Sequence, residues 1–105
     1  LPPDENKDCK HGYHLFTIQI DENRAGLSRD VFLNEMKMRN IGLGVHYQSI
    51  PEHPVYKKLF KWKASNFPYA YDFGKKTVSL PFSPSLKKDD VYDVISSIYD
   101  IFKKR

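Results

Sequence analysis

The last segment of the chain places the strongest constraint on the fold. Apolar residues recur there at helical spacing and would share one face of a helix: Val91, Val94, Ile95, Ile98, Ile101 and Phe102. Aspartates at 89–90 would stand at the positive start of this helix, and basic residues at 103–105 at its negative end. Because a helix with one apolar face must bury that face against another layer, the rest of the chain has to supply one.

Three short stretches are candidates for strands in that layer. The first, YHLFTIQI from Tyr13 to Ile20, alternates between two faces, as a half-buried strand does. One face would carry His14, Phe16, Ile18 and Ile20, and the other Tyr13, Leu15, Thr17 and Gln19. A second strand is expected at GVHY (44–47), and a third at TVSL (77–80), where a proline stops it.

Helices are expected between these strands. Ser28 can cap a helix that runs to about Arg39 and ends at Asn40 and Gly42. Its apolar stripe would consist of Val31, Phe32, Met36 and, as a further candidate, Leu33. Prolines at 51, 54 and 68 exclude a long element in the middle, but short helices are expected in PVYKKLF (54–60) and in FPYAYDFGKK (67–76).

The order of elements predicts an α+β fold. It is a two-layer sandwich in which helices cover a small, mainly antiparallel sheet of about three strands. Residues 1–12 are polar, proline-led and without period, so they are interpreted as a linker, and residues 13–105 as one domain.

Composition narrows the classes of function. The net charge is +4, but the lysines form scattered pairs, which is typical of a solvated surface rather than a track for phosphates. The one cysteine, Cys9, has no partner for an internal disulfide, which favours a reducing compartment. No apolar run approaches the roughly 20 residues that span a bilayer, so we expect a cytoplasmic protein without membrane contact.

His46 is the candidate site residue that the pattern itself suggests. A strand end that runs into a loop presents polar side chains to ligands, and an imidazole can donate or accept a proton at neutral pH. The alternative is a half-buried histidine bonded to a backbone carbonyl. Tyr47 is a lesser candidate, because its alternation with Val45 points it toward the core. The histidines do not converge at the spacing of a metal site, and Ser49 lacks the carboxylate that would complete a nucleophile.

The segment YKKLFKWK, from Tyr56 to Lys63, mixes lysines with aromatic residues. Proteins that bind single-stranded nucleic acid combine the same residue types. A short amphipathic helix with Leu59, Phe60 and Trp62 partly packed is the favoured interpretation, because no RNA-binding motif accompanies the segment. A free-standing basic module that binds nucleic acid or a protein partner therefore stays as the second hypothesis.

Three stretches together resemble the C-terminal domain of the DegT/DnrJ/StrS-type sugar aminotransferases. They are GYHLFTIQID, SRDVFLNEMKMRNIGLGVHYQSIPEHPVYKKL and FPYAYDFGKKTVSLPFSPSLKKDDVYDVISSI. The shared features are an Arg-Asp helix start, a glycine-containing turn into GVHY, a Pro-x-Tyr, and SLPFSP before a final amphipathic helix. The resemblance covers nearly the whole chain, in order.

The resemblance implies the small domain of an aspartate-aminotransferase-like enzyme that uses pyridoxal phosphate. Such an enzyme passes an amino group from an amino acid, commonly glutamate, to a keto carbon of a nucleotide-linked deoxysugar. The Schiff-base lysine and the groups that hold the cofactor would belong to a catalytic domain preceding Leu1, so this fragment alone would be inactive. The resemblance further implies a homodimer, no nucleic-acid partner, and a place for His46, with Tyr47 as the lesser candidate, near the mouth of the active site.

Overall fold

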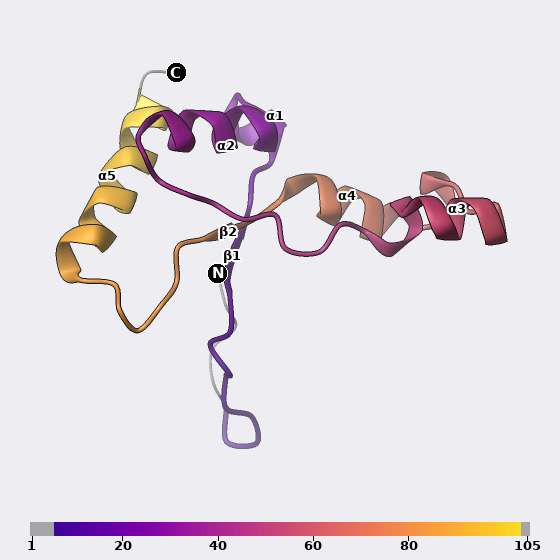
Figure 1. Ribbon diagram of the computed structural model, residues 1–105, viewed down its shortest axis with the longest axis horizontal. Helices are drawn as coiled ribbons and strands as arrows, with labels where there is room; N and C mark the ends of the chain where they lie inside the picture. The colour runs from indigo at the N-terminus through magenta and orange to yellow at the C-terminus, as the bar shows by residue number, and fades with distance from the viewer. Residues whose placement is uncertain (1–5, 104–105) are drawn as a thin grey trace.

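The computed structural model describes residues 6–103. Its strands are β1 (Phe16–Gln19) and β2 (Thr77–Leu80). Its helices are α1 (Glu22–Ala25), α2 (Arg29–Met38), α3 (Pro54–Phe60), α4 (Pro68–Lys76) and α5 (Lys88–Lys103), with 3-10 turns η1 (Ile50–Glu52) and η2 (Ala64–Asn66). Figure 1 shows the strands at the centre, α2 and α5 on one side of them, and α4 followed by α3 extending away on the other. The α+β class expected from the sequence is confirmed.

The sheet is smaller than expected. β1 pairs antiparallel with β2, with Phe16 opposite Leu80 and Ile18 opposite Val78. The predicted strand at 44–47 is wrong, because among the described residues only Gly44 bridges to Ser79, through hydrogen bonds of 2.7 and 3.1 Å. Three residues later the chain takes a left-handed backbone at Tyr47, which stops any extended pairing. The outcome is a two-stranded sheet with one added bridge.

The core lies between the sheet and the two helices α2 and α5. Its buried members are Ile20, Leu27, Phe32, Met36, Val78 and Ile101. The rings of Phe32 and Phe102 stack at 5.9 Å and join the two helices. The predicted stripes are confirmed for most positions, but Val31, Val91 and Ile95 are exposed and lie outside the core cluster.

Local chemistry sets the ends of the helices. The Ser28 hydroxyl accepts a hydrogen bond from the Val31 amide at 3.3 Å and caps α2, as expected. Asn40, just beyond the helix, has a left-handed φ of 59° and turns the chain away. The short α1 was not expected; the Asp21 side chain caps its start, and Gly26, with φ of 69°, ends it.

Parts of the expectations for the two ends fall outside the described residues. This applies to residues 1–5 of the interpreted linker and to the basic residues 104 and 105 after α5. Residues 6–12 hold a single bridge, between Asn6 and the exposed Cys9. Within residues 6–103, no helix combines the length and the apolar character needed to cross a bilayer.

Candidate functional site

The loop from His46 to Ile50 lies over the face of the sheet that does not carry the core. Together with α4 it encloses a shallow pocket of about 330 Å³. The floor includes Thr17 and Thr77, and the walls include Phe73 of α4. Both residues singled out from the sequence, His46 and Tyr47, line this pocket. The pocket is therefore the place where those candidates could meet a ligand.

Tyr47 has a strained backbone. Its φ of 69° is in the left-handed region, which costs an ordinary residue about 1–3 kcal/mol and is uncommon for a bulky side chain. The expectation that Tyr47 faces the core is wrong, because the left-handed turn reverses the alternation and leaves the side chain 77% exposed. Strain at an exposed aromatic residue beside a pocket is typical of functional sites.

Two glycines allow the loop to pack closely. A methyl group at Gly44 would collide with the imidazole of His46 and lie 2.9 Å from its Nδ1, so the ring rests against the Gly44 backbone. A methyl group at Gly74 would lie 3.0 Å from the Cβ of Ser49, so α4 touches the loop at that point. His46 is exposed, which excludes the alternative of a half-buried histidine.

Ser49 anchors the loop at a cost. It is buried, and its hydroxyl has no hydrogen-bond partner among the described residues. An unsatisfied buried hydroxyl costs about 1–3 kcal/mol. Ser79, whose backbone bridges to Gly44, is also buried, and its hydroxyl likewise has no hydrogen-bond partner among the described residues. The left-handed backbone at Tyr47 and the buried hydroxyl of Ser49 are both local costs to stability in this loop.

Replacing Tyr47 with glycine is expected to raise the free energy of unfolding by about 1 kcal/mol, because glycine adopts the left-handed backbone without steric cost. The exposed ring loses little packing. His46→Gly is the matched control, since His46 has no left-handed backbone, and it should lower stability. Urea unfolding of both variants measures the effect. A destabilised Tyr47→Gly variant would show that the ring's contacts outweigh the strain.

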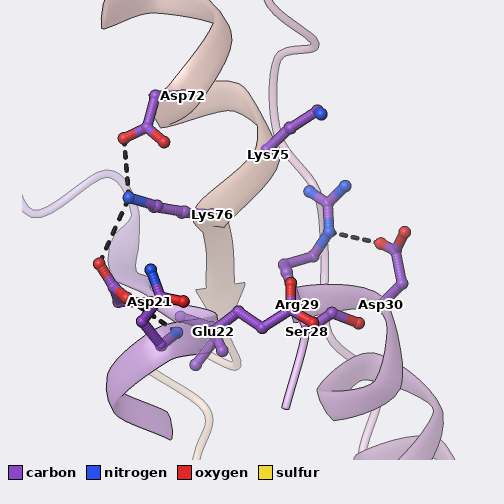
Figure 2. A pocket seen from close by; sticks show the side chains of 10 residues that line it. Asp21, Glu22, Ser28, Arg29, Asp30, Asp72, Lys75 and Lys76 are labelled. Carbon is purple, nitrogen blue, oxygen red and sulfur yellow. Dashed lines mark hydrogen bonds and ion pairs between the residues drawn. The ribbon is translucent and has the colours of Figure 1, made fainter. Parts of the chain in front are cut away.

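A second, polar pocket of about 420 Å³ lies between α1, α2 and the end of α4. Figure 2 shows Lys76 between two carboxylates, with its Nζ 2.9 Å from Asp72 and 3.3 Å from Asp21. Arg29 pairs with Asp30 and donates from Nη1 to the carbonyls of Gly74 and Thr77, both at 3.2 Å.

These contacts give the polar pocket a structural role. Arg29 satisfies the Gly74 carbonyl in the last turn of α4, which the helix itself leaves open, and the Thr77 carbonyl at the start of β2. Since Gly74 also touches Ser49, the same clamp fixes the wall of the loop's pocket. The Arg-Asp pair at the start of α2, noticed in the sequence only as part of a motif, thus holds α4 in place.

The ion pairs of Lys76 with Asp21 and Asp72 stabilise the fold over a defined pH range. Hydrogen bonding to Lys76 lowers the pKa of Asp21 below its usual 3.8, and hydrogen bonds to Asp72 and Asp21 raise the pKa of Lys76 above its usual 10.5. The Asp21 contribution is therefore present above 3.8 and is lost as the pH falls through the lowered pKa. The Lys76 contribution is present below 10.5 and is lost as the pH rises through the raised pKa.

We expect Asp21→Asn to be less stable than the unchanged protein by a constant amount from about pH 5 to about pH 9. The difference should shrink below pH 3.8, where the carboxylate is protonated in the unfolded chain and then in the folded one. Asparagine also caps helices well, so loss of the cap does not confuse the result. Thermal unfolding across this range measures it, and a difference that persists at pH 2 would contradict the ion pair as the cause.

The other sequence candidates do not join the site. His53 packs edge-on against Tyr56 at 6.5 Å, outside the lining of the loop's pocket. The aromatic residues of 56–63 stack on one another, as in Tyr56 on Trp62 at 5.5 Å and 10°, and α3 confirms the short helix. Among the described residues no group of three or more His, Cys, Asp or Glu could hold a metal ion.

The described residues do not fit pyridoxal phosphate. A lysine that forms an imine needs a lowered pKa and an apolar surrounding. The loop's pocket has no lysine in its lining, and the pKa values of Lys75 and Lys76 are raised, Lys75 by its hydrogen bond with Tyr71 and Lys76 by its carboxylate partners. Neither Lys75 nor Lys76 therefore has the lowered pKa that imine formation requires.

Known proteins resemble the chain in sequence and in fold. Residues 1–99 match the DegT/DnrJ/EryC1/StrS aminotransferase family. Over 104 residues the chain is 40% identical to the spore coat polysaccharide biosynthesis protein SpsC of Bacillus subtilis (strain 168). The matched region covers 98% of this chain and 27% of SpsC.

Solved structures of aminotransferases resemble the chain in fold. Helicobacter pylori PseC, an aminotransferase involved in the biosynthesis of pseudoaminic acid, superposes with a TM-score of 0.76 and 25% identity, over 88% of this chain and 24% of PseC. Spr1654 from Streptococcus pneumoniae, in its PMP form, superposes with a TM-score of 0.74 and 26% identity, over 87% of this chain and 22% of that one. The chain thus spans about a quarter of the length of the proteins it resembles.

Proposed function

The chain belongs to the DegT/DnrJ/EryC1/StrS aminotransferase family, and on that basis we propose that it is the C-terminal small domain of a pyridoxal-phosphate-dependent sugar aminotransferase. The observation that carries the proposal is its fold, which follows PseC over 88% of the chain at a TM-score of 0.76. The complete enzyme would move an amino group from an amino acid, glutamate in our proposal, to the ketone of a nucleotide-linked deoxysugar. We further propose that it is a cytoplasmic homodimer.

The pathway that we propose is the synthesis of an amino sugar for a surface polysaccharide. Two relatives support this assignment by their names, SpsC in spore coat polysaccharide biosynthesis and PseC in that of pseudoaminic acid.

In this proposal the small domain closes one side of the active-site cleft. Pyridoxal phosphate, bound by the catalytic domain, would supply the amino-group chemistry. The His46 ring is exposed at the rim of the loop's pocket and can donate a hydrogen bond to a hydroxyl or phosphate oxygen of the substrate. Tyr47, exposed beside it, would add an aromatic surface for the sugar ring.

The absorption spectrum of the complete protein tests this proposal. A Schiff base between pyridoxal phosphate and a lysine gives a visible band that borohydride abolishes, and we expect both observations. A second assay would then measure the transfer of the amino group from glutamate to a nucleotide-linked keto sugar. A colourless protein that does not take up pyridoxal phosphate would overturn the assignment.

A further inference from the structure

Residues 50–76 form an arm that stands apart from the core. It consists of η1, α3, η2 and α4, and Figure 1 shows α3 at its far end, on the side away from α2 and α5. None of its residues belongs to the core cluster. The arm has its own small aromatic cluster instead, in which Tyr56, Phe60 and Trp62 stack on one another and Phe67 meets Trp62 at a tilt. The arm is therefore internally ordered, and the end of α4, through Gly74 and Lys76, joins it to the body.

The outer surface of α3 is apolar. Val55 and Leu59, one helical turn apart, are 52% and 66% exposed, and Phe60 beside them is 56% exposed. We call these three residues the α3 patch. Apolar side chains gathered in this way at the tip of a projecting arm are unusual for a surface that meets only water.

Lysines surround the α3 patch. They stand at 57, 58, 61 and 63, and no acidic residue occurs between Glu52 and Asp72. An apolar centre with a charged rim is the arrangement of protein interfaces. Because the charges at 57–63 are all positive, a partner with carboxylates around an apolar surface would match this side of the patch.

The whole chain exposes more surface than its mass requires. Its accessible surface is 8419 Å², whereas a compact monomer of 12.3 kDa exposes about 6,100 Å². Its radius of gyration is 16.2 Å, against about 13 Å for a compact domain of this length. The projecting arm and the segment before β1 both stand out from the core in Figure 1 and account for this open shape.

We propose that the α3 patch docks on the catalytic domain of the same polypeptide. The proposal rests on the proposed function, because it takes that domain to be the three-quarters of SpsC and PseC that this chain does not cover. The docked surface has an apolar centre that receives Leu59 and Phe60 and carboxylates that face the surrounding lysines. The arm then ties the small domain to the catalytic domain at a point distinct from the loop's pocket.

Hydroxyl-radical labelling of the complete enzyme, native and denatured, tests the docking. We expect Leu59 and Phe60 to be labelled in the native enzyme at no more than about a tenth of their rate in the denatured one, as in an interface core. Labelling at half of that rate or more, as their exposure in the isolated fold would give, overturns the proposal. Protection that is lost on dilution to the monomer also overturns it, since the partner would then be a second copy.

A charge in the patch gives an independent test. Leu59→Asp in the complete enzyme should lower the midpoint of thermal unfolding by about 5 °C or more, because docking would bury the carboxylate. Met38→Asp is the matched control: Met38 is 71% exposed at the end of α2, outside the arm, and its change should shift the midpoint by no more than about 1 °C. Equal shifts in the two variants would overturn the docking.

These results separate the two proposals. An active aminotransferase with a labelled α3 patch removes the docking and leaves the function. A protected α3 patch in a protein that takes up no pyridoxal phosphate supports the docking and removes the function.

Discussion

Replacing Phe32 with alanine is expected to lower the free energy of unfolding by about 3–5 kcal/mol, enough to unfold a domain of this size in large part. Phe32 is fully buried at the centre of α2, and its ring stacks on Phe102 of α5. Only six apolar residues of the described part are buried, so neighbouring side chains have little means of filling the space that the ring leaves. Denaturant unfolding followed by circular dichroism measures the loss.

Val31→Ala is the matched control for this prediction. Val31 precedes Phe32 in the same helix, but its side chain is 41% exposed and lies outside the core. Alanine has the higher helix propensity, so the control should change stability by no more than about 0.5 kcal/mol. A loss below 1.5 kcal/mol for Phe32→Ala would show that the contact between α2 and α5 is looser than the structure has it.

Much of the fold could be predicted from the sequence, because local chemistry determines it. Each of the relevant signals acts within a few residues: the cap at Ser28, the stop at Asn40 and the prolines at 54 and 68. The helices begin and end close to the positions that these signals predict. The alternation from Phe16 to Gln19 likewise reports the two faces of one strand. These signals need no knowledge of the rest of the chain.

The loop could be predicted only in part, because its shape depends on contacts that are distant in sequence. His46 was singled out from its place near the end of an apparent strand, and its role in the site stays a prediction. The same interpretation assigned Tyr47 to the core, since alternation assumes an extended backbone that the left-handed turn interrupts. The approach of Gly74 to Ser49 joins residues 25 apart and leaves no pattern in the sequence. The signal available for it was an isolated glycine inside a helical stretch, which often marks close packing.

The second large effect concerns His46 in the complete enzyme. His46→Ala is expected to lower kcat/KM for the nucleotide-linked sugar by about 10- to 100-fold. The reason is the loss of one hydrogen bond to a charged group, which contributes about 1.5–3 kcal/mol. Turnover of the amino-acid donor in the half-reaction without sugar should stay unchanged, because that step does not engage the loop in our proposal. Unchanged sugar kinetics would remove His46 from the site.

Gly44 allows the position of the ring to be tested separately from its presence. Alanine at 44 collides with the imidazole, and the exposed ring can swing aside, so Gly44→Ala should keep the fold while moving His46. We expect it to reproduce a large part of the loss in kcat/KM with little change in thermal stability. Gly42→Ala is the control, since nothing lies within 4 Å of the added methyl group, and it should behave as the unchanged enzyme. If His46→Ala is impaired but Gly44→Ala is not, the imidazole acts from a position other than the one it occupies against Gly44.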